Sequence, residues 1–112
     1  MRELKFRCWF PKTERMTKPF ILGQLIEQIE NTREEENGVY LQFTGLTDKN
    51  GIEIYEGDIV AYLGKGEEVV EFDNGSFMVG LDGELPALLS SQIKCGCEII
   101  GNIYENKDLL KK

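Results

Sequence analysis

Apolar and polar residues alternate along most of the chain, with the period of two that is typical of half-buried β-strands. Near the amino terminus, one side of this pattern is apolar and the other carries mostly cations: Leu4, Phe6, Cys8 and Phe10 against Lys5, Arg7 and Trp9. Pro11 then ends the run. From Val39 onward, short β-favouring runs are separated by turn residues: VYLQFTGL, IEIY, DIVAYL, EVVEF, SFMVGL and CEIIGNIY. The pattern predicts a mainly β protein.

One segment follows a helical period instead. Four apolar residues recur with the i, i+3, i+4, i+7 spacing of an amphipathic helix: Leu22, Leu25, Ile26 and Ile29. The charged run 31–37 has no apolar stripe, and it indicates the end of that helix or a solvated loop. The segment 82–94 fits two interpretations, because its leucines have helical spacing after Pro86 while the surrounding runs favour strands. We therefore expect one or two short helices.

The stretch TGLTDKNGIEIYEGDIV, residues 44–60, gathers four acidic side chains: Asp48, Glu53, Glu56 and Asp58. They could form a cluster of catalytic or metal-binding carboxylates, or they could belong to two tight turns. The sequence Asp48-Lys49-Asn50-Gly51 is typical of a hairpin turn, in which Asp and Asn bond their own backbone and Gly takes a positive φ. Glu56-Gly57-Asp58 predicts a second bend, with the aspartate capping backbone N–H groups. We favour the turns, so neither loop needs a ligand.

A third turn signal, Asp73-Asn74-Gly75, separates two β-favouring runs. Type I′ hairpins favour Asn-Gly because both central residues need a positive φ. Short strands joined by such turns predict a small antiparallel barrel or curled sheet, SH3-like in part, in which closure protects the edge strands. With 112 residues, the chain is expected to form a single domain, residues 1–112.

The composition removes much enzyme chemistry. The chain contains no histidine, which excludes Ser-His and Cys-His nucleophile pairs and the usual general base at neutral pH. Cys95 and Cys97 could give two thiolates to zinc, but a structural site needs about four nitrogen or sulfur ligands. We expect this pair to lie at the entry to a strand, and Cys8 to be a small buried residue. The sequence therefore predicts no enzyme, and no catalytic residue, cofactor or metal ion.

The net charge of −7 comes from 20 acidic and 13 basic residues, and it repels phosphate backbones and anionic membranes. Proteins are therefore the expected partners. No apolar run of about 20 residues and no signal-peptide pattern is present, which predicts a cytoplasmic protein without membrane association. A basic face within this acidic chain stays open, because six cations lie near the amino terminus: Arg2, Lys5, Arg7, Lys12, Arg15 and Lys18.

Several blocks of the sequence resemble the YopX family, small proteins of bacterial phages and prophages. The block FTGLTDKNGIEIYEGDIV is similar to the family's most distinctive segment. FRCWF is similar to its Phe-Arg-Ala-Trp-Asp, VVEFDNGSF to its Val-Val-Glu-Trp-Asp-Asn-Gly, and CEIIGNIYENKDLL to its Glu-Val-Ile-Gly-Asn-Ile-Tyr-Glu-Asn-Pro. The chain departs from this pattern at four positions: Cys8 for alanine, Phe10 for aspartate, Phe72 for tryptophan and Lys107 for proline.

The resemblance implies a mainly β fold, phage or prophage origin and homo-oligomerisation, and it brings no established activity, cofactor or catalytic residue. We expect a non-catalytic protein of unknown biochemical role that binds protein, either itself or a host or phage protein. Three aromatic residues form a candidate contact surface, although core packing is the simpler role for each: Trp9, Tyr55 and Tyr104. Two alternatives stay open: an SH3-like barrel that binds nucleic acid, and an acidic nucleic-acid mimic that inhibits a host protein.

Overall fold

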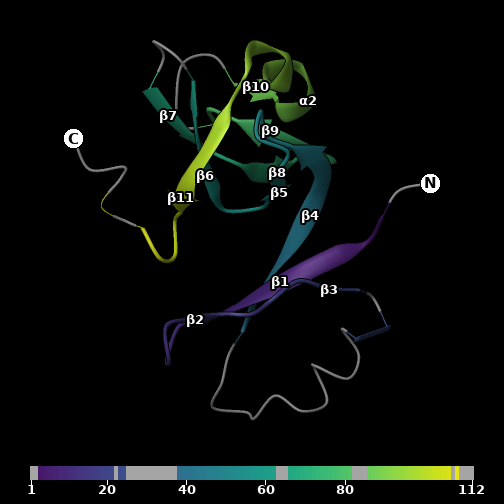
Figure 1. Ribbon diagram of the computed structural model, residues 1–112, viewed down its shortest axis with the longest axis vertical. Helices are drawn as coiled ribbons and strands as arrows, with labels where there is room; N and C mark the ends of the chain where they lie inside the picture. Colours follow the sequence, from purple (N-terminus) through teal and green to yellow (C-terminus); the bar gives the residue numbers. More distant parts are fainter. Residues whose placement is uncertain are drawn as a thin grey trace. The chain divides into compact units, whose positions relative to one another are not determined.

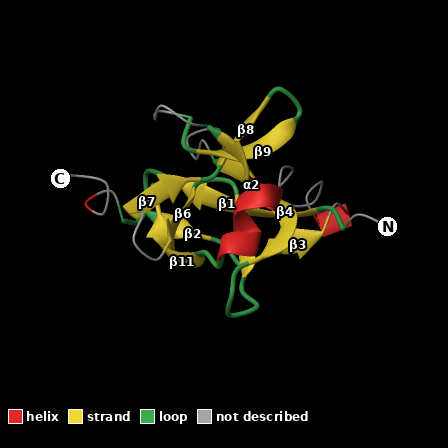
Figure 2. Cartoon of the chain, turned by 90° about the horizontal axis from the view of Figure 1, so that it is seen from above, coloured by secondary structure: helices red, strands yellow, loops and turns green. Residues whose placement is uncertain are grey.

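The computed structural model of the chain describes residues 3–21, 23–24, 38–62, 66–81, 86–106 and 108. Internal contacts group the chain into two compact units, Met1–Phe43 and Thr44–Lys112. Strands predominate in both units (Figure 1, Figure 2). The predicted mainly β class, with curled sheets and one short helix, is confirmed. Within the described ranges, no helix is long and apolar enough to cross a membrane.

The first unit is built around β1, with β2 and β3 along one edge and β4 along the other (Figure 1). The strands are β1 (Lys5–Phe10), β2 (Arg15–Met16), β3 (Phe20–Ile21) and β4 (Val39–Thr47), whose last residues belong to the second unit. All pairings with β1 are antiparallel, and Trp9 lies opposite Met16 and Val39. As predicted, β1 ends immediately before Pro11.

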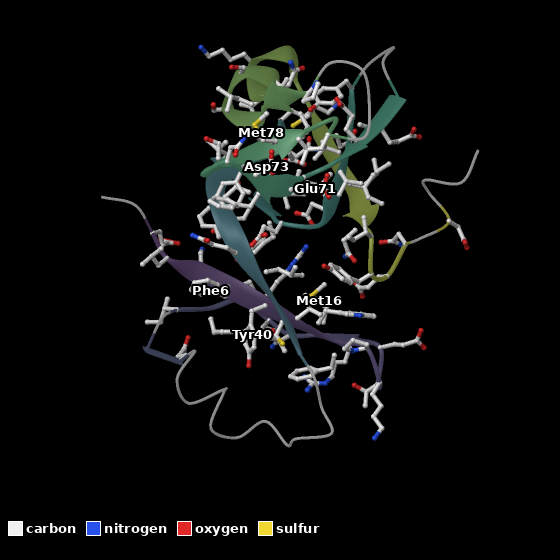
Figure 3. All side chains as sticks on the ribbon, turned by 180° about the vertical axis from the view of Figure 1, so that it is seen from behind. Phe6, Met16, Tyr40, Glu71, Asp73 and Met78 are labelled. Atoms are coloured by element: carbon white, nitrogen blue, oxygen red, sulfur yellow. The ribbon has the colours of Figure 1, made fainter. Side chains whose placement is uncertain are left out.

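One face of β1 forms a small, mostly aromatic core. Cys8, Phe10 and Phe20 are buried, and Phe6 and Tyr40 pack against them (Figure 3). The rings of Phe20 and Tyr40 meet edge to face with their centroids 6.4 Å apart, a favourable geometry for aromatic pairs. The alternation in the first ten residues thus predicted the side of β1 that carries this core.

The predicted amphipathic helix lies almost entirely outside the described residues, as does the charged run 31–37. Within the predicted helix, only Gly23 and Gln24 are described, and both are helical. The Ile21 N–H donates to Gln24 Oε1 at 3.0 Å, a contact found at the start of helices. The helix over Leu22 to Ile29 stays a prediction.

The second unit consists of two three-stranded antiparallel sheets, β11-β6-β7 and β10-β9-β8, together with β5 and α2 (Figure 1). Its strands are β5 (Glu53–Tyr55), β6 (Asp58–Tyr62), β7 (Gly66–Val69), β8 (Glu71–Asp73), β9 (Ser76–Val79), β10 (Ala87–Leu88) and β11 (Glu98–Asn102). Helix α2 (Leu89–Gln92) continues into a 3-10 helix, Ile93–Cys95. A register shift between Ile99 and Gly101 marks a bulge in β11.

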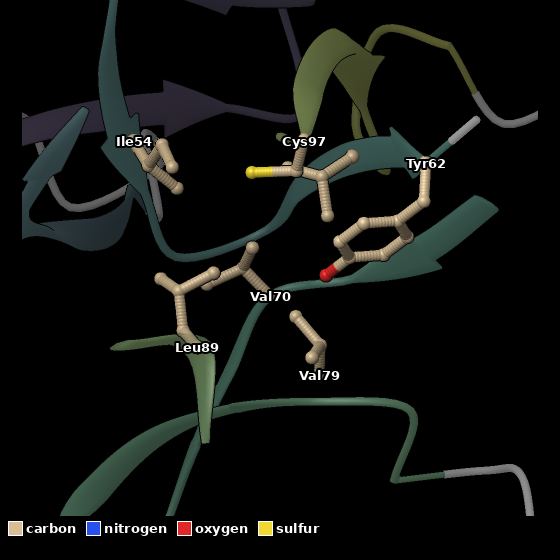
Figure 4. Packing of buried hydrophobic residues seen from close by; sticks show 7 residues of the cluster. Ile54, Tyr62, Val70, Val79, Leu89 and Cys97 are labelled. Atoms are coloured by element: carbon tan, nitrogen blue, oxygen red, sulfur yellow. The ribbon is translucent and has the colours of Figure 1, made fainter. Parts of the chain in front are cut away.

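The core of the second unit draws on both sheets and on α2 (Figure 4). Its buried members are Ile54, Val60, Tyr62, Val70, Val79, Leu89 and Cys97. Full burial of one such aliphatic side chain contributes about 1.5–3 kcal/mol to stability. Because these residues come from several short strands that could not fold alone, the shared core is what makes each strand stable.

The run EVVEF, predicted as one strand, forms two. β7 ends at Val69, β8 begins at Glu71, and Val70 belongs to neither. The Val70 N–H donates to Asp58 O at 2.9 Å, and the Val70 carbonyl accepts the Gly57 N–H at 2.8 Å. The prediction of a single strand was wrong because the chain passes from one sheet to the other at Val70. Val70 is fully buried there, and its backbone pairs with residues 57 and 58 instead of continuing a strand.

The ambiguous segment 82–94 contains both kinds of structure, although residues 82–85 lie outside the described residues. Ala87 and Leu88 form β10, and α2 begins at the next residue. Leu89 is fully buried, whereas Leu88 is 45% exposed. The change from strand to helix between these two leucines sends their side chains into different environments, which their helical spacing alone did not predict.

Candidate functional site

The turn between β4 and β5 is built around the carboxylate of Asp48. Its Oδ1 accepts the N–H groups of Asn50 (2.8 Å) and Ile52 (3.0 Å), and Gly51 has a φ of 81°. Its Oδ2 accepts the N–H of Ile99 in β11 at 3.0 Å. The predicted turn chemistry is confirmed, and the third hydrogen bond joins the turn to a strand 51 residues further along the chain.

Asp48 is only 6% exposed, and burial and hydrogen bonding shift the pKa of its side chain in opposite directions. Burial alone would raise the pKa of this carboxyl group. The three backbone hydrogen bonds and the charge of Lys49 outweigh burial, and they hold the pKa below its ordinary value of 3.8. Asp48 is therefore ionised at neutral pH, and its oxygens are engaged in holding the fold.

The second acidic bend, residues 56–58, also serves the backbone. Asp58 is 2% exposed, and its Oδ2 accepts the N–H of Tyr55 at 2.8 Å, which confirms the predicted cap. Gly57 has a φ of 84°, and a Cβ at this position would lie 2.8 Å from Cε2 of Tyr104. Glycine is therefore needed at position 57 for two reasons, the left-handed backbone and the close approach of an aromatic ring.

The closing block GNIYEN forms a turn that bonds to itself. Asn102 is 6% exposed, and its Oδ1 accepts the N–H groups of Tyr104 (3.0 Å) and Glu105 (2.8 Å). Asn106 Oδ1 in turn accepts the Asn102 N–H at 3.1 Å. A Cβ on Gly101 would lie 2.5 Å from the same Asn106 oxygen, so a larger residue at position 101 would displace the Asn106 side chain from its bond to Asn102. The block therefore fixes the position of Tyr104.

The three aromatic residues predicted as a contact surface differ in exposure. Trp9, in the first unit, is 6% exposed, and Tyr55, in the second, is 2% exposed. The Tyr55 hydroxyl donates to Glu53 Oε1 at 3.2 Å. Tyr104 is half-buried, and burial together with the charge of Glu56 raises the pKa of its hydroxyl. Trp9 and Tyr55 are packed in the interior of their units. The role in a contact surface stays a prediction, and of the three residues Tyr104 is the most accessible for it.

The thiols of Cys8 and Cys97 are free and fully buried. Burial raises the pKa of the Cys8 thiol, and the positive charge of Arg15 opposes this only in part. Burial is also the main cause that raises the pKa of the Cys97 thiol, and the negative charge of Asp48 adds to it. A thiol that stays protonated is a poor nucleophile and a poor metal ligand. The predicted structural roles are confirmed, because Cys8 lies in a core and Cys97 directly precedes β11.

Among the residues described, no group of three or more His, Cys, Asp or Glu could hold a metal ion.

The turn between β8 and β9 is as compact as predicted. Asp73 lies opposite Ser76, so Asn74 and Gly75 form a two-residue loop. Their φ angles are 50° and 78°, both positive as a type I′ turn requires. Residues 71–75 are all exposed, so this turn stands at the end of a solvent-exposed strand.

One face of the β10-β9-β8 sheet points away from the core. Val79 is fully buried in the core, so the neighbouring Met78 lies on the opposite face of β9. Residues directly opposite on adjacent strands share a face, which adds Glu71 of β8 and Leu88 of β10 to Met78. Asp73 and Ser76, the opposite pair two positions further along the hairpin, lie on the same face. We call this set the acidic face: Glu71, Asp73, Ser76, Met78 and Leu88. Glu71, Asp73 and Met78 are labelled in Figure 3.

An open groove adjoins the acidic face. It has a volume of about 330 Å³ and is lined by Thr44, Leu46, Ser76, Phe77, Leu88 and Ser90. Two of these residues, Ser76 and Leu88, also belong to the acidic face. Nearby, Phe72 is 53% exposed and rests edge-on against Phe77, with ring centroids 5.0 Å apart. Apolar side chains bordered by the hydroxyls of Thr44, Ser76 and Ser90 resemble the centre and rim of a protein-binding site.

Charge is distributed unevenly along the chain. The sequence from Gly66 to Ile93, which includes the acidic face, contains no lysine or arginine. The first 20 residues carry six basic and two acidic side chains, and residues 44–112 carry six basic and 13 acidic ones. Three of the early cations are exposed: Lys12, Arg15 and Lys18. The described part of the chain therefore presents a basic region in one unit and an acidic region in the other.

Sequence reasoning did not find the acidic face. Met78 and Leu88 lie in runs that read as core strands or as an ambiguous helix, and only strand register shows that both point away from the core. One signal was present in the sequence, namely the absence of cations from Gly66 to Ile93. These 28 residues carry acidic side chains and no lysine or arginine, so their negative charge is not balanced within the stretch.

Comparison with known proteins agrees with this architecture. The family model described as YopX protein matches residues 5–111. The crystal structure of protein EF1440 from Enterococcus faecalis has a similar fold, with a TM-score of 0.70 over 99% of this chain and 100% of that chain, at 22% sequence identity. No curated protein matches the chain. Because the family model covers nearly the whole sequence, this chain belongs to the YopX protein family.

Proposed function

We propose that this chain is a non-catalytic protein-binding module of phage or prophage origin, which acts in the cytoplasm of a bacterial host and associates with copies of itself. The observation that carries the proposal is the acidic face. It leaves Leu88 45% exposed and Met78 only half-buried, beside the groove of about 330 Å³. Uncovered apolar side chains rimmed by polar ones mark interaction sites on small soluble domains.

The chemistry of the most suggestive residues supports a binding role over catalysis. The carboxylates of Asp48 and Asp58 are buried and accept backbone N–H groups, so they are committed to the fold. The thiols of Cys8 and Cys97 are buried and protonated. A general base or nucleophile needs access to substrate and a pKa suited to its task. None of these four groups has both.

Light scattering coupled to size-exclusion chromatography tests the proposal. We expect a mass above the 12.8 kDa of one chain at micromolar concentrations. Leu88→Ser should lower the average mass, because it removes the most exposed apolar side chain of the acidic face. Ile100→Ser is the matched control, since Ile100 is 38% exposed but lies on β11. A 12.8 kDa monomer over the whole concentration range would contradict self-association.

Nucleic-acid binding is the competing function, and the exposed cations Lys12, Arg15 and Lys18 favour it. Fluorescence anisotropy with labelled single- and double-stranded oligonucleotides separates the two functions. We expect no binding near physiological salt, because the net charge of −7 opposes it. Tight binding that weakens steeply with salt and is lost on replacing the three cations would show that the basic region reads nucleic acid.

A further inference from the structure

The acidic face is an anionic surface with an apolar centre. Glu71 and Asp73 are exposed on β8, which is the edge strand of its sheet and is only three residues long. Across from Glu71 lies Met78, and beyond it Leu88. Because no cation occurs from Gly66 to Ile93, these carboxylates have no neighbouring positive charge within that stretch. A partner that fits must bring positive charge around an apolar centre.

The first unit carries a surface of that description. β1 and β2 form a hairpin, and β2 is an edge strand that pairs with β1. We call residues 11–18 the basic hairpin. Its three cations, Lys12, Arg15 and Lys18, are exposed, and its centre holds the half-buried Met16. The one acidic residue in this segment, Glu14, does not balance them.

We propose that the acidic face of one copy binds the basic hairpin of a second copy, so that the chains associate head to tail. This inference rests on the proposed self-association and names the two surfaces involved. Both surfaces combine exposed charge with a methionine at the centre, and their charges are opposite. Because the surfaces differ, the contact is heterologous and repeats from copy to copy, which generates a closed ring or an open chain.

The charges make the contact sensitive to salt. The Debye length falls from roughly 10 Å at 0.1 M ionic strength to roughly 3 Å at 1 M, so exposed ion pairs weaken as salt rises. We expect the average mass at a fixed protein concentration to fall between about 50 mM and about 500 mM sodium chloride. An association held by apolar contacts alone would keep or strengthen its mass over the same range.

Charge reversal provides the direct test. The acidic face is reversed by Glu71→Lys with Asp73→Lys, and the basic hairpin by Lys12→Glu with Lys18→Glu. Arg15 is left unchanged because its guanidinium stacks over the Phe10 ring, 4.7 Å from the centroid. Each double variant alone should raise the dissociation constant at least tenfold at low salt. Mixed in equal amounts, the two should associate again, because every contact then joins opposite charges.

The quadruple variant is the matched control. It keeps the net charge of −7, reverses both surfaces, and should associate with itself as the wild type does. Circular dichroism and thermal melting establish that each variant is folded. Wild-type mass in both double variants, or a mixture that stays dissociated, would overturn this inference and leave self-association through another surface intact. A wild type that is monomeric at every concentration and salt would overturn the proposed self-association as well.

Discussion

Two hairpin turns of the second unit have similar sequences and different surroundings. Asp48-Lys49-Asn50-Gly51 and Asp73-Asn74-Gly75 both combine an aspartate with Asn-Gly, and both reverse the chain between antiparallel strands. In the first turn the aspartate is 6% exposed and accepts three backbone N–H groups, one of them from β11. In the second turn the aspartate is exposed and lies on the acidic face.

The difference teaches that a turn motif determines local geometry but not the role of its carboxylate. Asp48 closes the fold because β11 passes beside it and offers the N–H of Ile99. Asp73 stands at the end of a short edge strand, where its charge is exposed to solvent. We therefore assign structure to the first turn and propose binding for the second, and the predictions below test these assignments.

The largest effect is expected from Asp48→Ala. Removing the carboxylate leaves three backbone N–H groups without their acceptor, and a buried unsatisfied donor costs about 1–3 kcal/mol. We predict a loss of about 3 kcal/mol in the free energy of unfolding. Water can replace the lost acceptor at the exposed Asn50 and Ile52, so most of this loss comes from the N–H of the more buried Ile99. Urea denaturation followed by circular dichroism measures this loss. A loss below about 1 kcal/mol would show that this turn is not a structural junction.

A smaller loss is expected from Gly57→Ala. The added Cβ meets the Tyr104 ring at 2.8 Å and must occupy a left-handed φ of 84°, which together should cost about 2 kcal/mol. Gly75→Ala is the matched control, since its φ is 78° and nothing lies within 4 Å of the new Cβ. It should cost about 1 kcal/mol, from the backbone alone. Equal losses in urea denaturation would mean that the Tyr104 contact contributes nothing.

Acid should weaken the first turn selectively. The folded-state pKa of Asp48 lies below its ordinary value of 3.8, so its stabilisation is complete above that pH and is lost as pH falls through the folded value. We predict that thermal stability declines below about pH 4 in the wild type and that Asp48→Asn, which cannot titrate at this position, declines less. Parallel melting curves for the two proteins between pH 5 and pH 2 would contradict the assignment.

The smallest effect is expected from Asp73→Ala. An exposed side chain away from caps and cores rarely changes stability by more than about 0.5 kcal/mol. The same substitution should weaken self-association, because it removes one carboxylate of the acidic face. Urea denaturation and light scattering on one preparation measure both quantities. A destabilised variant with unchanged mass would reverse the division between the two turns.

Much of the local structure could be predicted from the sequence. Asn-Gly at two turns specified both hairpins, and alternation specified the side of β1 that carries Cys8 and Phe10. Gly57 could be expected at a bend. These features depend on the conformations of a few neighbouring residues, which the amino-acid types themselves constrain.

The missing features depend on partners far along the chain. Nothing near Asp48 indicates the N–H of Ile99, 51 residues away, or the ring of Tyr104 above Gly57. The strand break at Val70 likewise depends on its backbone pairing with residues 57 and 58. The outward orientation of the Leu88 side chain depends on its register with Met78. The acidic face was missed for the same reason, since register and burial decide which apolar residues of a short strand remain uncovered.

Hydrogen exchange of the Ile99 amide tests the structural half of this account most directly. In Asp48→Asn, an amide nitrogen can stand in place of Oδ2, the oxygen that accepts the Ile99 N–H, while Oδ1 keeps its bonds to Asn50 and Ile52. We predict slow exchange at Ile99 in the wild type and exchange at least tenfold faster in the variant, with smaller changes elsewhere in β11. An Ile99 amide that exchanges in the wild type as fast as those of Asn74 and Gly75 would contradict the claim that the two turns have different roles.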